Sequence, residues 1–339
     1  MNILGIDTSC DDTSAAVVVE GRKILSNIVH SQVKLHHPHG GVVPELASRE
    51  HLRNIMPVVQ EALAKAGTGM GDIDGLAVTV GPGLVGSLLV GLYYAKAMSY
   101  VNGLPMAAVN HLEGHILSIF LEEDVPEFPF ICMTVSGGHT SIYNVKGYGD
   151  YLQMGQTLDD AAGEAFDKVA KILGLGYPGG AVIEKLARQG KVDKIDFPRA
   201  FLSKDSLDFS FSGLKTSVSL FIRKWKDKEA DSGVSLADIA ASFQEAVIDV
   251  LVAKVLKAAG MMKTDSVVVA GGVACNNRLR KRLKQDASGK GIRIYHPRPS
   301  YCTDNGAMIA VAGYRRLLEG HETEMSVDVR SKYPIEDID

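Results

Sequence analysis

The chain begins Met1-Asn2-Ile3-Leu4-Gly5-Ile6-Asp7-Thr8-Ser9-Cys10-Asp11-Asp12, and a second apolar run, Ala15–Val19, follows. Two apolar runs around a short turn of small and acidic residues predict a β-hairpin. A strand is expected over Leu76–Val80, then the turn Gly81-Pro82-Gly83 and a helix over about Leu84–Tyr100. Together these elements predict a mixed α/β lobe.

The same order of elements recurs in the second part of the chain. It consists of the run Phe130–Val135, the turn Ser136-Gly137-Gly138-His139, the strands Ser141–Val145 and Ser266–Ala270, the turn Gly271-Gly272 and a helix from Cys275 to about Ala287. A pattern that recurs without matching letters indicates two duplicated lobes. Two such α/β lobes predict an actin/sugar-kinase-like (ASKHA) fold, in which a nucleotide binds in the cleft between the lobes.

The lobes are expected to meet near residue 125, because Pro126 and Pro129 interrupt the chain there. We therefore predict an N-terminal lobe over residues 1–125 and a C-terminal lobe over residues 126–339. A helical insertion over about residues 150–260 would account for the greater length of the second lobe. Its predicted helices cover Asp159–Leu173, Gly180–Arg188 and Leu236–Lys257.

The composition is that of a globular chain. Of 339 residues, 46% are hydrophobic and 22% charged, with a net charge of −4, which argues against a disordered, fibrous or strongly basic coat protein. The four scattered cysteines favour a reducing compartment without disulfides. The start does not read as a secretory signal, and a glycine–proline turn interrupts the uncharged stretch Gly75–Ala95. We expect a cytoplasmic protein with no membrane segment.

A histidine pair is the first candidate for chemistry. In His111-Leu112-Glu113-Gly114-His115, the spacing of four puts both imidazoles on one face of a helix, as a clamp for Zn²⁺ or Fe²⁺. The glutamate is not at the position it has in HExxH. Asp304, in a turn before an apolar helix, is the candidate third ligand. The alternative is a helix cap beside a surface histidine, with Asp304 capping the last helix.

Glycine turns are the second candidate. The turns at Ser136–Thr140, Gly179-Gly180 and Gly271-Gly272 can offer backbone N–H groups to a phosphate, with helix N-termini adding favourable potential. The chain has neither GxxxxGK[ST] nor GxGxxG after a strand, which excludes a P-loop and disfavours a dinucleotide fold. We predict a nucleotide site, although each pair alone is compatible with a plain turn.

Charged clusters leave two interpretations open. Acids gather in the first hairpin turn and at helical spacing in Asp159, Asp160, Glu164 and Asp167, where they either serve a ligand or form a solvated face. Cations gather in Arg278, Arg280, Lys281, Arg282 and Lys284, and again in Lys185, Arg188, Lys191 and Lys194. These patches either contact nucleic-acid phosphates or solubilise a helix. The run His36-His37-Pro38-His39 is either a ligand loop or, more commonly, a surface loop.

Nine motifs stand in order along the chain: Asp7–Thr13, Gly40–Arg49, Gly81–Leu84, Asn110–His115, Val135–Thr140, Gly163–Lys168, Tyr177–Gly180, Phe211–Thr216 and Gly271–Asn276. Together they closely resemble the bacterial tRNA N6-adenosine threonylcarbamoyltransferase family, once called O-sialoglycoprotein endopeptidases. The resemblance runs from Asn2 to about Arg316. It implies the ASKHA fold.

The resemblance also implies an activity. Members of the family transfer a threonylcarbamoyl group from threonylcarbamoyl-AMP to N6 of adenosine 37 in tRNAs that read ANN codons, releasing AMP. The alternatives are an ASKHA-type phosphotransferase and, from the older family name, a metallopeptidase. The missing HExxH speaks against the peptidase.

By resemblance, His111, His115 and Asp304 would bind one divalent metal, Fe²⁺ most often and Zn²⁺ in some descriptions. The substrate-binding residues would be Thr134, Val135, Ser136, Gly137, Gly138, Asp167, Gly180, Glu184 and Asn276. No residue is an obvious general base, and Asp11 is a candidate only from its place in the first hairpin.

The family works with partners, namely a truncated paralogue and a small ATPase, while a separate synthase makes the adenylate. The helix over Leu84–Tyr100 is our candidate for the paralogue contact, because it is rich in small residues and poor in charge. The remaining expected partners are tRNA and threonylcarbamoyl-AMP, with no membrane.

Overall fold

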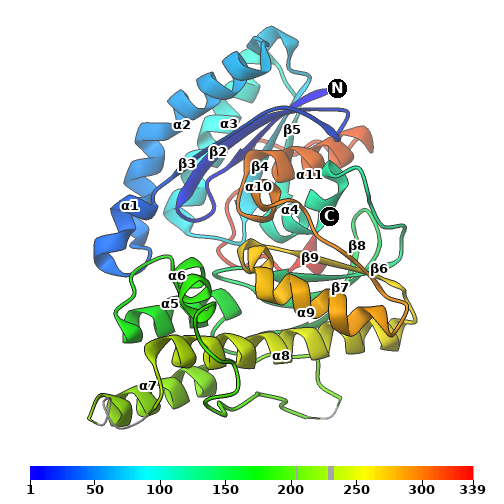
Figure 1. Ribbon diagram of the computed structural model, residues 1–339. Helices are drawn as coiled ribbons and strands as arrows, with labels where there is room; N and C mark the ends of the chain where they lie inside the picture. Colours follow the sequence, from blue (N-terminus) through cyan, green and yellow to red (C-terminus); the bar gives the residue numbers. More distant parts are fainter. Residues whose placement is uncertain (204, 228–232, 339) are drawn as a thin grey trace. The chain divides into compact units, whose positions relative to one another are not determined.

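The computed structural model describes residues 1–203, 205–227 and 233–338. The chain divides into two compact units (Figure 1). The first comprises Met1–Val125 and Pro297–Asp339, and the second comprises Pro126–His296.

The first unit is built on a five-stranded sheet in the order β3-β2-β1-β4-β5. Its strands are β1 (Asn2–Asp7), β2 (Asp12–Val19), β3 (Lys23–Ser31), β4 (Gly75–Gly81) and β5 (Met106–Asn110). Strands β1, β2 and β3 are antiparallel neighbours, whereas β1, β4 and β5 are parallel.

The second unit repeats this plan in a five-stranded sheet of order β10-β9-β6-β7-β8. Its strands are β6 (Phe130–Val135), β7 (Thr140–Gly147), β8 (Asp150–Gln156), β9 (Ser266–Ala270) and β10 (Arg293–Tyr295). Strands β6, β7 and β8 are antiparallel neighbours, and β6, β9 and β10 are parallel. The two sheets have the same connectivity, which confirms the predicted pair of duplicated α/β lobes.

Helices cover both faces of the first sheet. They are α1 (Val33–His36), α2 (Pro44–Ala66), α3 (Val85–Asn102), α4 (His111–Leu117), α10 (Pro299–Cys302) and α11 (Gly306–Leu318). Leu4 and Ile6 of β1 share an apolar core with residues of α2 and α3. Gly5 alternates with them toward α11, where an added Cβ would lie 2.2 Å from the Gly306 carbonyl oxygen. Only glycine permits so close an approach.

The packing of α11 on β1, β2, β4 and β5 corrects the predicted domain limits. Residues 297–339 belong to the first unit, although the sequence placed them in a second lobe running to residue 339. The predicted boundary rested on local prolines, whereas this contact joins positions about 300 residues apart in the sequence.

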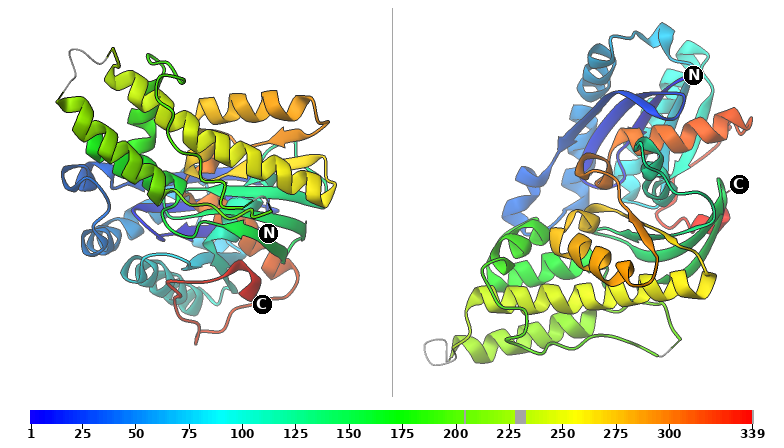
Figure 2. Two further views of the ribbon diagram at one scale, coloured as in Figure 1. Left: turned by 90° about the horizontal axis from the view of Figure 1, so that it is seen from below. Right: turned by 45° about the vertical axis from the view of Figure 1, so that its right-hand side comes forward.

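The helices of the second unit are α5 (Ala162–Leu173), α6 (Gly179–Ala187), α7 (Ser212–Lys226), α8 (Leu236–Met262) and α9 (Asn277–Ser288). Helix α5 contacts α7, and α6 contacts α8 (Figure 1; Figure 2). The predicted helical insertion over about 150–260 is wrong at its start, because residues 150–156 form β8 and pair with β7. Within that range, 204 and 228–232 lie outside the described residues.

Among the described residues, no helix is both long enough and apolar enough to cross a membrane.

Candidate functional site

The predicted metal ligands lie at the ends of two buried helices of the first unit. Helix α4 begins at His111, directly after β5, and the Asn110 side chain caps it by accepting a hydrogen bond from the Leu112 amide at 2.9 Å. In the same way, Asn305 caps α11 by accepting from Met308. Neither His111 nor Asp304 is therefore occupied as a helix cap, which removes the alternative that the sequence left open.

The structure brings the three side chains together. Asp304 Oδ1 lies 3.5 Å from His111 Nε2 and 3.2 Å from His115 Nε2. One candidate ligand atom from each residue lies within 4.8 Å of the others. The exposed fractions of His111 and His115 are 5% and 0%. Two buried imidazoles and one carboxylate, converging from two helices, form the donor set expected for Fe²⁺ or Zn²⁺.

Buried ring nitrogens at this cluster have no hydrogen-bond partner among the described residues, which leaves them available to a cation. Both ring nitrogens of His115, and Nδ1 of His111, are buried without a hydrogen bond among the residues described. Burial alone would lower the pKa of His111, but the carboxylates of Asp304 and Asp7 outweigh it and raise that pKa to about 10. The cluster therefore has an excess of negative charge that a proton or a metal cation can balance.

Asp7, which the sequence offered only as one of the acids of the first hairpin turn, borders this cluster, as does an ion pair that the sequence did not predict. Asp7 Oδ1, at the end of β1, lies 3.6 Å from His111 Nδ1, where it can orient the ring. Arg316 Nε donates to Glu113 Oε2 at 3.1 Å, and both side chains are largely buried. This pair joins α4, which carries both histidines, to α11, which follows Asp304. Asp11 lies in the turn that follows Asp7 and is only partly buried.

In the second unit, the turn between β6 and β7 is shaped to receive an anion. The Ser136 amide donates to the His139 carbonyl at 2.8 Å, and the His139 amide donates to Ser136 Oγ at 3.1 Å. The amides of Gly137 and Gly138 have no acceptor in the described part of the chain, and both residues are exposed. Next to the turn, the Thr134 hydroxyl is buried without a partner. Two free N–H groups in one turn can bind a phosphate.

Contacts connect this turn to the start of α5 and then to α6. The Gly163 amide donates to the Ser136 carbonyl at 3.1 Å, and a Cβ on Gly163 would lie 2.5 Å from that oxygen. From α5, Asp167 Oδ1 accepts from the Gly179 amide at 2.7 Å, which fixes the beginning of α6. Gly180 follows directly and has open space where a Cβ would be.

Further contacts connect α6 to α9, and α9 back to the turn between β6 and β7. Glu184 Oε1 accepts from Asn277 Nδ2 at 2.8 Å and from the Asn277 amide at 3.3 Å. Gly271, at a φ of +93°, precedes the 3₁₀ helix η5 (Gly272–Cys275), and a Cβ there would lie 2.5 Å from the Val135 carbonyl oxygen. The predicted substrate-binding residues thus lie along one closed ring of contacts. The N-termini of α5, α6 and α9 all belong to this ring, and their dipoles favour an anion.

Asn276 has a structural role that the sequence did not show. Its Oδ1 accepts from the Leu279 amide at 3.0 Å as the N-cap of α9, and its Nδ2 donates to Gln244 Oε1 at 2.8 Å. The pattern of asparagine three residues before an apolar position of a helix was available in the sequence.

The four acids predicted to lie on one helix do not all lie on it. Asp159 and Asp160 precede α5 rather than lying on it, so that part of the prediction is wrong. Asp159 accepts from the amides of Phe211 and Ser212 and so fixes the start of α7. Asp160 pairs with Lys168 at 2.7 Å and with Lys215 at 2.9 Å. These two acids are structural.

Two arginines of the predicted basic patch on α9 are paired with acids, whereas Lys281 and Lys284 are exposed. Arg278 forms a two-pronged pair with Glu245, with Nε to Oε2 at 2.8 Å. Arg282 pairs with Glu245 and, at 3.0 Å, with Asp249. The run from His36 to His39 is likewise local structure, because His36 is buried and accepts from the Val43 amide.

Comparisons with known proteins identify the family and the fold of the chain. The sequence profile described as tRNA N6-adenosine threonylcarbamoyltransferase matches residues 23–311. The chain belongs to the tRNA N6-adenosine threonylcarbamoyltransferase family. The Syntrophus aciditrophicus and Thermodesulfovibrio yellowstonii proteins of that name are each 53% identical over 336 residues, covering 99% of this chain and 98% and 100% of theirs.

Solved structures show that this member of the tRNA N6-adenosine threonylcarbamoyltransferase family shares the predicted ASKHA fold. Full-length HypF in a phosphate- and nucleotide-bound form matches with a TM-score of 0.62 at 15% identity, over 95% of this chain and 56% of HypF. ROK hexokinase from Thermus thermophilus matches with a TM-score of 0.52 at 14% identity, over 94% and 100%. At such identities the likeness establishes the fold.

Proposed function

We propose that the protein transfers a threonylcarbamoyl group from threonylcarbamoyl-AMP to N6 of adenosine 37 in tRNAs that read ANN codons, releasing AMP. Family membership supports transfer to tRNA and the biosynthesis of N6-threonylcarbamoyladenosine. The choice of donor is supported by the closed ring of contacts in the second unit. This ring includes the turn with the two free amides and the N-termini of α5, α6 and α9. An adenylate offers the anionic phosphate that such a ring favours.

The chemistry explains why binding groups dominate the site. The donor is a mixed anhydride of a carbamic and a phosphoric acid, so AMP is a good leaving group. The adenine N6 amine is a weak nucleophile, because its lone pair is delocalised into the ring. The enzyme must therefore place the two reactants and stabilise charge on the carbonyl or phosphate oxygens. The amides of Gly137 and Gly138 are the free donors for that charge.

We assign the remaining substrate contacts by residue. Thr134 offers its unpaired hydroxyl, while Asp167, in the middle of α5, is joined through Gly179 to the start of α6, where Gly180 lies. Glu184 has one carboxylate oxygen engaged by Asn277, which leaves Oε2 for a ribose hydroxyl. Asn276 shapes the ring as the cap of α9.

We propose that His111, His115 and Asp304 hold one divalent metal, with Fe²⁺ as the first choice and Zn²⁺ as the second. The buried, unpaired ring nitrogens of His115 support this assignment. When bound, such a metal supplies Lewis-acid chemistry toward substrate oxygens. Asp7 orients His111, and Asp11 is the proposed acceptor of the N6 proton, from its position in the turn between β1 and β2.

We further propose that the enzyme acts in the cytoplasm with a truncated paralogue and a small ATPase. The candidate surface for the paralogue is α3, which exposes Tyr93, Tyr100 and Val101 to exposed fractions of 59%, 83% and 78%. Large apolar side chains exposed together on one helix are typical of a protein interface.

A single-turnover assay tests the function. The full chain, with the paralogue, is mixed with threonylcarbamoyl-AMP labelled in threonine and an unmodified tRNA carrying A37. Label in the tRNA together with released AMP is expected. Release of AMP without labelled tRNA would contradict the acceptor, and absence of both products would contradict the donor.

A further inference from the structure

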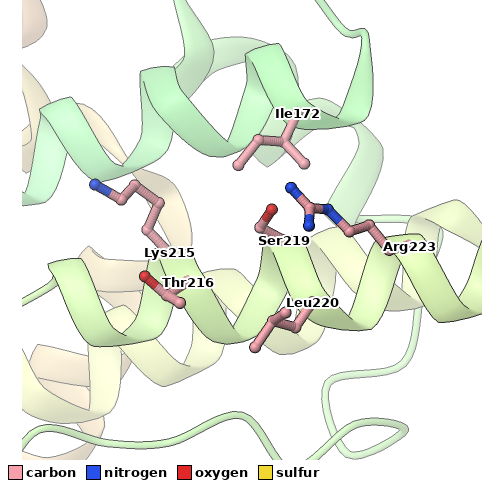
Figure 3. A pocket seen from close by; sticks show the side chains of 6 residues that line it. All are labelled: Ile172, Lys215, Thr216, Ser219, Leu220 and Arg223. Atoms are coloured by element: carbon pink, nitrogen blue, oxygen red, sulfur yellow. The ribbon is translucent and has the colours of Figure 1, made fainter.

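A groove between α5 and α7 lies outside the ring of contacts described above. It encloses about 300 Å³ and is lined by Ile172 of α5 and by Lys215, Thr216, Ser219, Leu220 and Arg223 of α7. Figure 3 shows the Arg223 guanidinium extending from α7 beside the Ser219 hydroxyl and Ile172, with Lys215 at the other end. The groove has a cation at each end and hydroxyl groups between them, while Ile172 and Leu220 supply apolar wall.

Helix α7 is the source of this charge. It carries four cations, Lys215, Arg223, Lys224 and Lys226, and no acid. Lys215 pairs with Asp160 at 2.9 Å, but Arg223, Lys224 and Lys226 have no ion-pair partner within residues 1–203, 205–227 and 233–338. All three are exposed. On α9, by contrast, Arg278 and Arg282 are bound to acids of α8, and only Lys281 and Lys284 are comparably exposed.

The spacing of these groups fits an extended phosphate backbone. Lys215, Ser219 and Arg223 follow each other at intervals of four, so they form one stripe along α7, and Lys226 returns to that stripe three residues later. Eight residues of helix separate Lys215 from Arg223, a distance of about 12 Å along the axis. Arginine, lysine and serine are the side chains that commonly contact phosphate and sugar oxygens of nucleic acids.

We propose that the groove between α5 and α7 binds the sugar-phosphate backbone of the substrate tRNA. Arg223 contacts a phosphate and Ser219 donates a hydrogen bond within the groove, and Lys226, on the same stripe of α7 but beyond the groove, contacts a neighbouring phosphate. This inference rests on the proposed function, because it takes tRNA as the acceptor. It assigns the main electrostatic contact to α7 and not to α9, which carries one of the two basic patches named in the sequence. The groove contacts no base, so it increases the affinity for tRNA without a preference for its sequence.

The experiment measures binding of the full chain to an unmodified tRNA with A37, by fluorescence anisotropy between about 50 and 300 mM salt. Each phosphate contact with single-stranded RNA contributes about 0.7 to the salt slope, which is about fivefold in affinity near 0.1 M salt. Arg223→Gln with Lys226→Gln should therefore weaken binding about 25-fold and reduce the slope by about 1.4. Arg22→Gln with Lys23→Gln, also one arginine and one lysine at exposed positions, is the matched control.

A third variant, Lys281→Gln with Lys284→Gln, tests the competing helix α9 and should bind tRNA as the parent does. The inference is overturned if this variant loses affinity while the α7 variant keeps it. It is also overturned if the α7 variant binds tRNA normally but loses transfer in the assembled complex, because the groove would then serve an acidic protein. Failure of the parent chain to modify tRNA would instead contradict the proposed function. Thermal unfolding of each variant checks that the fold is intact.

Discussion

The turn between β1 and β2 and the turn between β6 and β7 occupy the same place in two sheets of the same connectivity, yet they carry opposite chemistry. The first follows Asp7 and contains Asp11, with Asp12 opening the next strand. The second consists of Ser136, two glycines and a histidine, without an acid. The acidic end lies beside two histidines and Asp304. The other presents free amides to a ring of helix N-termini.

The difference shows that the same hairpin connectivity can carry side chains that favour ligands of opposite charge. In the first unit, carboxylates and imidazoles favour a cation. In the second, backbone N–H groups and helix dipoles favour an anion. Replacing side chains in the turn is therefore expected to change which ion binds while the sheet stays intact.

Removal of the histidine pair should have the largest effect. His111→Ala with His115→Ala leaves Asp304 without its two partners, and one carboxylate does not hold Fe²⁺ or Zn²⁺ tightly. Metal measured by mass spectrometry should fall to background, and transfer should be lost. His37→Ala with His39→Ala removes two exposed histidines and is the matched control. Full metal content in the first variant would refute the site.

An acid placed in the second turn should abolish its preference for anions. A Cβ added at Gly137 would have no other atom within 4 Å, so Gly137→Asp fits without steric strain. A carboxylate about 6 Å from a phosphate charge costs about 3 kcal/mol at an effective dielectric constant of 20, or roughly 100-fold in affinity. Calorimetric titration with AMP measures it. Gly137→Asn, which has the same shape without the charge, should lose much less, and equal losses would show that charge is not the cause.

A smaller effect is expected where the turn meets α5. In Gly163→Ala, the new Cβ would lie 2.5 Å from the Ser136 carbonyl oxygen, so the turn has to move. We expect a cost of about 1–3 kcal/mol in stability and weaker binding of AMP. Gly260→Ala adds the same methyl group to α8, where no atom lies within 4 Å, and should stabilise by about 0.5–1 kcal/mol. Similar results for the two variants would contradict the close approach at Gly163.

The sequence predicted best those features that neighbouring residues determine. The hairpins and the strand–turn–helix units could be predicted because apolar runs and glycine turns mark them directly. The spacing of His111 and His115 predicted for the same reason that both imidazoles lie together, as they do beside Asp304. Helix α7 was missed, although Leu214, Val218, Ile222 and Trp225 are buried at helical intervals and the pattern was available.

Non-local contacts could not be predicted in this way. The pairing of Arg278 with Glu245 joins positions 33 residues apart, so the composition of α9 alone could not show that two of its arginines are paired while Lys281 and Lys284 stay exposed. The return of α11 to β1 depends on the glycine contact between Gly5 and Gly306. The closeness of Asp7 to His111 depends on the pairing of β1 with β4 and of β4 with β5.

The smallest expected effect concerns Asp12, whose Oδ1 is buried without a partner. Burial, together with Asp11 and Asp304, raises the pKa of this carboxyl from an ordinary 3.8 to about 7, although a hydrogen bond from Ser31 opposes the shift. A raised folded-state pKa contributes stability that is fully present below the unfolded value and is lost as the pH rises through 7. Asp12→Asn removes this loss, because the amide does not ionise.

The melting temperature of Asp12→Asn relative to the parent should therefore rise by a few degrees between pH 4 and pH 8. Calorimetry at several pH values measures this difference, and Asp193→Asn, at an exposed position, controls for the loss of one carboxylate. If the difference in melting temperature does not change with pH, ionisation of the buried Asp12 carboxyl does not destabilise the first turn. The contrast between the two turns would then rest on the histidine cluster alone.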